Sequence, residues 1–316
     1  MQPPTRVHRR SRSTHWRPIH GLRALMAGAV VALTPAVAAT PAPAPAAAPL
    51  MLGVQNGLAN ESQLAMDNAA QALADLIGGT AGRSVLWKAH FTAKDAVPSP
   101  AETRYDFAFV KPPNLVALLL AKGWTLVATA KDPVGFGTDF IAQPCPGHPG
   151  QVLLGGPSMA ILNVAELGPA RCVAVDKVWT ATDAVLLVPA KGSLVDKMAT
   201  RLWREHGAAM PRVVHVDTQN AVTGLMRDMH VSAIGVVTPL VSKPWVANGG
   251  VLLQHAPMPF WAMLAAPDTS PDLIAKVRAA LTGPAAAHAD KALHIPGWQA
   301  GDAKPYLAFQ QWLEAK

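Results

Sequence analysis

The residues most suited to chemistry lie in three short turns, each between an apolar run and a predicted helix, at residues 111–114, 191–193 and 217–220. The amino end of a helix presents free N–H groups and a partial positive charge, and both favour an anion. The sequence therefore predicts an anion-binding site with these candidate residues: Asn114, Lys191, Gly192, Ser193, Gln219 and Asn220.

Some aromatic and hydroxyl residues have a second, structural interpretation. Ser193 precedes a predicted helix, where a serine commonly caps the first turn through its hydroxyl. Trp179 and Trp245 could form walls of a ligand cleft, but large aromatic side chains also pack in cores. The sequence leaves both interpretations open for these residues.

Sequence motifs of enzymes are absent. There is no Gly-x-Ser-x-Gly turn, phosphate-binding loop, His-Glu-x-x-His motif or dinucleotide-binding fingerprint. His206, His215, His230 and His255 fall at the ends of predicted elements, and none has a second histidine four residues away. We therefore expect no catalytic residues, no bound metal and no cofactor, and the sequence favours a binding protein over an enzyme.

The net charge of +7 is concentrated near the amino terminus. Residues 1–39 contain six arginines and no acidic residue, and the remaining 21 Lys and Arg almost balance the 20 Asp and Glu. A nucleic-acid-binding protein needs a basic face on its folded domain. The charge distribution therefore argues against a nucleic-acid partner.

Residues 1–39 have the parts of a secretory signal peptide, namely a basic start, the apolar run 22–33 and the small residues 36–38. We expect this segment to be cleaved and the remainder exported, with an uncleaved amino-terminal anchor as the alternative. The arginine pair at residues 9 and 10 lacks the apolar residues that follow a twin-arginine motif, and the export route stays open. Residues 40–49 are rich in Pro and Ala, which predicts an extended linker.

The sequence has two cysteines, Cys145 and Cys172, which export would place in an oxidising compartment. A pair in such a compartment tends to form a disulfide, and two buried free thiols are the alternative. Two thiols without a Cys-x-x-Cys motif make a poor zinc site. We therefore predict a disulfide between the two cysteines.

The central stretch 105–130 predicts a strand, a helix and a second strand, because two prolines separate two apolar runs and Gly123 ends the helical one. Such a β-α-β unit implies a parallel sheet. Strands and helices alternate elsewhere too, so the predicted class is α/β. Further strands are predicted at 50–54, 84–91, 139–142, 184–188, 212–216, 233–237, 251–253 and 260–265, and further helices at 60–77, 93–103, 194–206, 218–229, 270–281 and 305–314.

The stretch 105–130 also resembles a segment of type II periplasmic binding proteins, above all the phosphonate-type substrate-binding proteins of ABC transporters. That segment has Tyr-Asp before apolar residues, a Pro-bearing turn, and a helix ending in Gly and an aromatic residue. Residues 213–226 and 233–239 match a second part of the pattern, and the resemblance covers about residues 50–285. It implies a two-lobed fold, in which each lobe is a mostly parallel sheet flanked by helices.

The resemblance also implies a division of the chain. Residues 50–135 with 245–316 would form the first lobe, and residues 136–244 the second. Where the family has a short turn, this chain has additional residues between its two cysteines. We therefore expect an insertion at about 145–172, closed by the predicted disulfide.

The function that the resemblance implies is an exported, periplasmic and monomeric solute-binding protein. It would capture a small anionic ligand between its lobes for the membrane permease of an ABC importer. The alternatives are a ligand-binding sensor without a transporter and an enzyme that reuses the fold. Family contacts to phosphonate correspond to Gly192 and Ser193, with Lys191 adding charge, and a polar pair of the family corresponds to Gln219 and Asn220.

The chain departs from the family at several implied contacts. Asn114 stands where the family often has Ser or an aromatic residue, and the usual Ser-Thr-Ser type of run is missing near Ser193. The resemblance adds Thr238 to the candidate ligand contacts, at a position where an acidic residue of the family often binds the amine of the ligand. The missing run argues against phosphonate itself, so the expected ligand is a phosphonate-like or related oxyanion. The missing acid argues against an aminoalkyl ligand.

Overall fold

The computed structural model describes residues 48–55, 63–90, 104–155, 169–207 and 209–315. The predicted signal peptide, most of the predicted linker and the predicted helix at 93–103 lie outside these ranges. Among the described residues, no helix combines the length and the apolarity that crossing a membrane requires.

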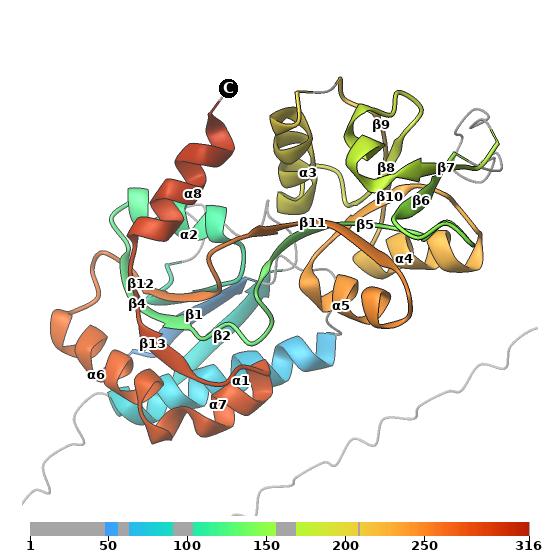
Figure 1. The fold of residues 1–316 in the computed structure, drawn as a ribbon. Coiled ribbons are helices and arrows are strands. Elements are labelled where there is room, and N and C mark those ends of the chain that lie inside the picture. The colour runs from blue at the N-terminus through green and yellow to red at the C-terminus, as the bar shows by residue number, and fades with distance from the viewer. Residues whose placement is uncertain (1–47, 56–62, 91–103, 156–168, 208, 316) are drawn as a thin grey trace, which may run out of the picture. The chain divides into compact units, whose positions relative to one another are not determined.

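A six-stranded sheet and its helices make up what we call the first lobe (Figure 1). The strand order is β13-β4-β12-β3-β1-β2, in which β1 pairs in parallel with β2 and β3. Its elements are β1 Leu50–Gln55, α1 Gln63–Ala81, β2 Val85–His90, β3 Phe107–Val110, α2 Pro113–Ala121, β4 Thr125–Ala130, β12 Ala262–Ala265, α6 Pro271–Thr282, α7 Ala287–Leu293, β13 Trp298–Ala300 and α8 Lys304–Glu314.

Both faces of this sheet are covered by apolar layers. Phe107 and Phe109 of β3 pack in a core with residues of α1, α6 and α7, whereas Ala108 and Val110 pack in a core with residues of α2 and α8. Successive side chains of a strand point to opposite faces, so a strand buried on both faces is apolar throughout. This explains the continuous apolar run from which β3 was predicted.

The predicted strand-helix-strand unit at 105–130 is present, but its two strands are not neighbours. β3 and β4 run in the same direction, and β12 lies between them, antiparallel to both. The two strands of the unit therefore have the parallel direction that was predicted, with one antiparallel strand between them. β12 is as fully buried as β3, and its apolar side chains are accommodated in the middle of the sheet.

A five-stranded sheet and its helices make up the second lobe (Figure 1). The order is β11-β5-β10-β8-β9, in which β8 pairs in parallel with β9 and β10 while β5 is antiparallel to β10 and β11. Helix α3 covers one face, and α4 and α5 cover the other. Its elements are β5 Gly137–Ala142, β8 Val185–Pro189, α3 Leu194–Glu205, β9 Arg212–Val216, α4 Gln219–Asp228, β10 Ile234–Val237, α5 Pro239–Ala247 and β11 Val251–Pro257.

The two lobes are joined by the strands β5 and β11. β5 follows β4 of the first sheet, and β11 precedes β12 of the first sheet. The lobe limits predicted near residues 135 and 244 remain a prediction. Sheet membership favours a later second limit, because β11 is hydrogen-bonded to β5.

The segment between the cysteines contains a small sheet of its own. β6 Gln151–Leu154 pairs antiparallel with β7 Arg171–Ala174, and the short helix η2 Val175–Thr180 follows. Cys145 and Cys172 form the predicted disulfide, with their Cα atoms 5.6 Å apart. Residues 156–168 of the predicted insertion lie outside the described ranges.

Candidate functional site

In each sheet, buried polar side chains lie at the carboxyl ends of parallel strands, and we call this side of the sheet its edge. Gln55 ends β1 and Lys111 follows β3, while Thr238 follows β10 and Asp139 pairs with the last residue of that strand. In open α/β sheets, ligands bind outside the carboxyl ends of the strands. The buried polar residues among those described are Gln55, Lys111, Thr138, Asp139, Gln219, Ser232, Thr238 and Ser242.

In the second lobe, Gln219 and Thr238 form what we call the second half-site. The Oε1 atom of Gln219 accepts from the backbone N–H of Thr238 at 2.7 Å and from its hydroxyl at 2.9 Å. These bonds fix the amide of Gln219, and its Nε2 makes no hydrogen bond to any described residue. The structure thus brings two predicted residues together, with an amide donor left for another group.

This half-site sits between two helix starts. Thr218 caps α4 by accepting from the N–H of Ala221 at 3.1 Å. Thr238 precedes α5 but makes no cap through its side chain, because its hydroxyl is bonded to Gln219. The first N–H groups of a helix have no intrahelical partner, so these starts add donors to the edge.

The polar groups of the turn after β8 form hydrogen bonds with the turn itself and with the first turn of α3. The hydroxyl of Ser193 accepts from the N–H of Asp196 at 3.2 Å and donates to the carbonyl of Pro189 at 3.1 Å. The N–H of Gly192 donates to the Asp196 carboxylate at 2.8 Å. Ser193 is thus a helix cap, and the carboxylate of Asp196 already occupies the amino end of α3. Lys191 is exposed in the same turn.

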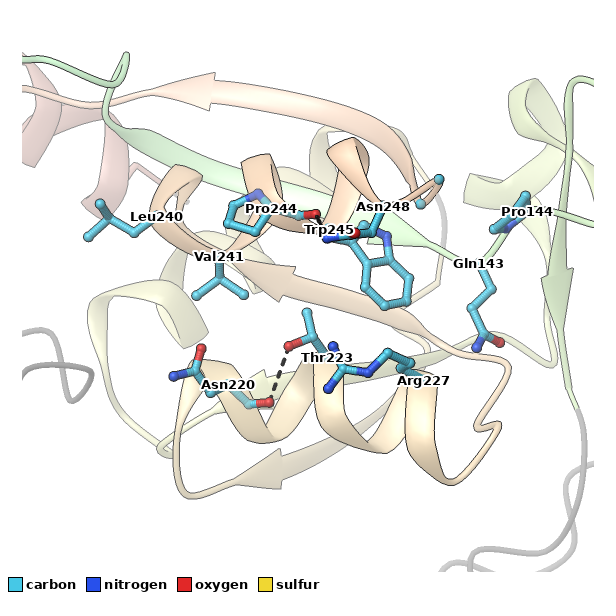
Figure 2. Close-up of a pocket in the computed structure, with 12 residues that line it drawn as sticks. Gln143, Pro144, Asn220, Thr223, Arg227, Leu240, Val241, Pro244, Trp245 and Asn248 are labelled. Atoms are coloured by element: carbon cyan, nitrogen blue, oxygen red, sulfur yellow. Dashed lines mark hydrogen bonds between the residues drawn. The ribbon is translucent and has the colours of Figure 1, made fainter.

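Asn220 follows Gln219 in the chain but does not belong to the second half-site. It lines a groove of about 410 Å³ between α4 and α5, which Gln219 does not line. Figure 2 shows Trp245 of α5 facing Thr223 and Arg227 of α4 across this groove. Trp245 is fixed there, since its indole N–H donates to the carbonyl of Ala142 at 3.1 Å. Trp245 therefore lines a groove on the flank of the second lobe.

In the first lobe, Lys111 and Trp261 form what we call the first half-site. The Nζ atom of Lys111 lies 4.2 Å from the centroid of the Trp261 ring, a cation–π geometry. Trp261 also stacks on Phe260, with ring centroids 4.4 Å apart. Its Nε1 atom is buried and has no hydrogen-bond partner in the described part of the chain.

Asn114 lies in the first turn of α2, and the structure places it in a different recess. It lines a cavity of about 380 Å³ together with residues of α3 and α8, among them Lys197 and Arg201. Its Oδ1 atom is buried and makes no hydrogen bond to the described residues. Asn114 thus faces cations of α3, and it does not share a cavity with Gln219.

Sequence reasoning missed Trp261 and did not single out Lys111. The available signals were a lysine directly after an apolar strand and an aromatic pair directly before one. Neither signal is specific without the strand register. Trp179, which was considered for a cleft wall, packs against Phe140 and Trp203 instead and stacks on His206.

Comparisons with known proteins agree with the architecture. No protein-family model and no curated protein matches the sequence. XAC2383 from Xanthomonas citri, solved with ATP bound, aligns with a TM-score of 0.59 and 13% identity over 84% of this chain and 96% of its own. PhnD1 from Prochlorococcus marinus, in complex with methylphosphonate, aligns with a TM-score of 0.59 and 9% identity over 83% and 96%.

A binding component of an ABC phosphonate transporter from Pseudomonas aeruginosa aligns with a TM-score of 0.54 and 9% identity, over 83% of this chain and 84% of its own. Identities this low establish the fold alone. The chain has the two-lobed fold of the type II periplasmic substrate-binding proteins.

Proposed function

We propose that the chain is an exported solute-binding protein that captures a small anionic ligand between its two lobes. The observation behind this proposal is the first half-site. Lys111 and Trp261 are only 2% and 5% exposed, and the indole N–H has no partner in the described residues. A buried N–H without an acceptor is rare in folded proteins, and an anionic ligand would supply the acceptor for the indole N–H of Trp261.

The polar groups at the strand ends suit an oxyanion better than a cation. Lys111, Trp261 and the amide nitrogen of Gln219 are hydrogen-bond donors. Asp139 is a buried carboxylate at the same edge of the second sheet, and its oxygens already accept from His255 and Ser242. A phosphonate-like or related oxyanion has the acceptors that the indole N–H of Trp261 and the amide nitrogen of Gln219 need.

Binding of the ligand would shift the protein from an open arrangement of its two lobes to a closed one. An anion that accepts from both half-sites binds the closed arrangement more tightly, and this differential affinity favours closure. Asn114, Lys191, Gly192, Ser193 and Asn220 remain proposed contacts, of which Ser193 and Gly192 would have to exchange bonds that they now make within their own turn.

The fold also suggests where such a protein would work. Its structural neighbours include a component of an ABC phosphonate transporter, and we propose a permease of that class as the partner of a monomeric, periplasmic protein. Cleavage of residues 1–39 would release it, with residues 40–49 as the linker. Amino-terminal sequencing of exported protein should find a start near Ala39 or Thr40, and a start at Met1 would contradict cleavage.

Thermal unfolding against a panel of small anions tests the function. The panel should contain phosphonates, sulfonates, phosphite, carboxylates and nucleotides. A ligand at 100 times its Kd stabilises a protein by about 2.7 kcal/mol, which raises Tm by roughly 5 to 10 °C for a protein of this size. Lys111→Met should abolish the shift, whereas Lys276→Met, a change at an exposed lysine of α6, should preserve it.

Two results would overturn the proposal. One is a panel in which no anion raises Tm. The other is a stabilising anion whose affinity is unchanged in Lys111→Met while circular dichroism shows the native fold.

A further inference from the structure

A buried carboxylate joins three elements of the second lobe. Asp139 is the third residue of β5, and its side chain is only 3% exposed. One oxygen interacts with Nδ1 of His255 on β11 at 2.6 Å, and the other accepts from the hydroxyl of Ser242 on α5. Burying a charge is unfavourable unless it is paired and hydrogen-bonded, and both partners are present here.

This arrangement orients the imidazole of His255. A carboxylate oxygen accepts hydrogen bonds, so the 2.6 Å contact orients Nδ1 of His255 toward Asp139 as its donor. The Nε2 atom is then the one available to another molecule. The side chain of His255 is 36% exposed, so the imidazole is held from within the protein and reaches the surface.

The backbone of β5 leaves room for this imidazole. A Cβ atom at Gly137 would lie 2.6 Å from Cε1 of His255, closer than such atoms approach in proteins. The same Cβ atom would lie 2.4 Å from the backbone carbonyl oxygen of Ala256, so a side chain at residue 137 would displace both β11 and the ring. Gly137 is thus a third residue that supports the placement of His255.

A cavity of about 480 Å³ adjoins His255, Asp139 and Ser242. Its lining includes Lys243, for which no ion pair is formed among the described residues. Other parts of the wall are apolar, and Leu252 and Val246 are left 44% and 42% exposed. We call this the hinge cavity, because Val134 and Gly135 of the β4–β5 connection also line it.

We propose that the hinge cavity binds a small amphipathic carboxylate. The carboxylate would accept from the ammonium of Lys243 and share a proton with Nε2 of His255, and the hydrocarbon part would cover Val134, Val246 and Leu252. The cavity volume is within the range of small-molecule sites, about 300 to 1,000 Å³. Asp139 has both oxygens engaged, so a cation would find no free carboxylate there.

This site is separate from the two half-sites, since none of Lys111, Trp261, Gln219 and Thr238 lines the hinge cavity. The amphipathic character follows from the lining itself. The ammonium of Lys243 favours an anionic head, and the exposed aliphatic side chains favour a short apolar tail, because covering them removes apolar surface from water.

Hexanoate is a suitable probe, with acetate and hexan-1-ol as controls that lack the tail and the head. Titration followed by the imidazole resonances of His255 and by calorimetry should show saturable binding of hexanoate, and weaker binding of both controls. Lys243→Gln and His255→Gln should each weaken hexanoate at least tenfold, as expected for losing a hydrogen bond to a charged group. Lys276→Gln should leave its affinity unchanged.

Failure to perturb His255, or equal affinity in Lys243→Gln, would overturn the proposal. So would hexan-1-ol binding as tightly as hexanoate, which would indicate an apolar surface without recognition of the anion. Lys243 is exposed, so its variant keeps the assay informative even if His255→Gln does not fold. Hexanoate should also bind Lys111→Met normally, and loss of binding there would place hexanoate in the first half-site instead.

Discussion

Lys111 and Trp261 lie face to face because of the register between β3 and β12. Val110 pairs with Ala262 in an antiparallel ladder, so Lys111, which follows Val110, lies opposite Trp261, which precedes Ala262. The ammonium of Lys111 is therefore 4.2 Å from the centroid of the indole ring. The two residues are remote in the sequence, and the first half-site exists only once these strands pair.

Trp261→Phe separates the role of the indole N–H from that of the ring. Phenylalanine retains apolar stacking on Phe260 but removes a buried donor that has no partner among the described residues. We expect the free energy of unfolding of the ligand-free protein to stay unchanged within about 1 kcal/mol, since no hydrogen bond is lost. Affinity for an anion found in the panel should fall roughly tenfold.

Urea unfolding and calorimetry measure these two quantities on the same preparations. A large loss of stability would mean that the N–H already has an acceptor. Unchanged affinity would remove Trp261 from the ligand site.

Gln219→Glu tests the second half-site. A glutamate keeps an oxygen that can accept from the N–H and hydroxyl of Thr238, but it replaces the amide donor with a negatively charged oxygen. Repulsion of the ligand and loss of its donor should weaken anion binding at least tenfold. Calorimetric titration measures this, and Gln299→Glu, the same change at an exposed residue of β13, is the matched control. Equal losses in both variants would indicate a general charge effect.

The disulfide should stabilise the second lobe. Cys145 and Cys172 are 27 residues apart, and closing such a loop restricts the unfolded chain by roughly 3 to 4 kcal/mol. We expect Cys145→Ala with Cys172→Ala to lower the free energy of unfolding by up to this amount in urea. A reductant should destabilise the wild type similarly and leave the double variant unchanged. Labelling of denatured, unreduced protein should find no free thiol.

Tyr306 of α8 should make stability sensitive to alkaline pH. Its hydroxyl donates to the carbonyl of Phe260 at 2.7 Å, and burial raises its pKa to about 12 from 10.0. Tyr306→Phe removes this bond, which should cost about 1 to 3 kcal/mol at pH 9 because a buried carbonyl loses its donor.

The pH dependence of Tyr306 has a definite sign. Between pH 10 and 12 the unfolded tyrosine loses its proton while the folded one keeps it, so rising pH favours unfolding. The wild type should lose about 1.4 kcal/mol per pH unit through this group, whereas Tyr306→Phe has no such group to titrate. The gap between the two proteins should therefore narrow from pH 9 to pH 11 in urea unfolding, and a constant gap would contradict the raised pKa.

Local chemistry determined many elements directly. Ser270 caps α6 and Pro271 is its first residue, and Thr218 caps α4. Gly123, with a φ of +85°, follows the end of α2. These signals act within a few residues, so the sequence shows them without knowledge of the fold. The disulfide was predictable as well, because the sequence offers one possible pair.

Other elements carried no such local signal. Neither α5 nor α7 was predicted from the sequence, although Pro239 at the start of α5 is a favourable first residue. Pro244 inside α5 argues against a helix locally, and the apolar contacts of Val241 with the second sheet outweigh it. The stabilisation that a helix gains by packing on a sheet depends on the tertiary structure, and the helix propensity of the sequence does not include it.

Tertiary structure alone decided which polar groups meet. The insertion of β12 between β3 and β4 brings Trp261 to Lys111, and the pairing of β5 with β11 brings His255 to Asp139. Gln219 meets Thr238 because β9 and β10 end at the same edge of one sheet. The sequence shows which residues are donors and acceptors. The partner of each depends on the register between strands that are remote in the sequence, and this register is determined by the packing of whole sheets.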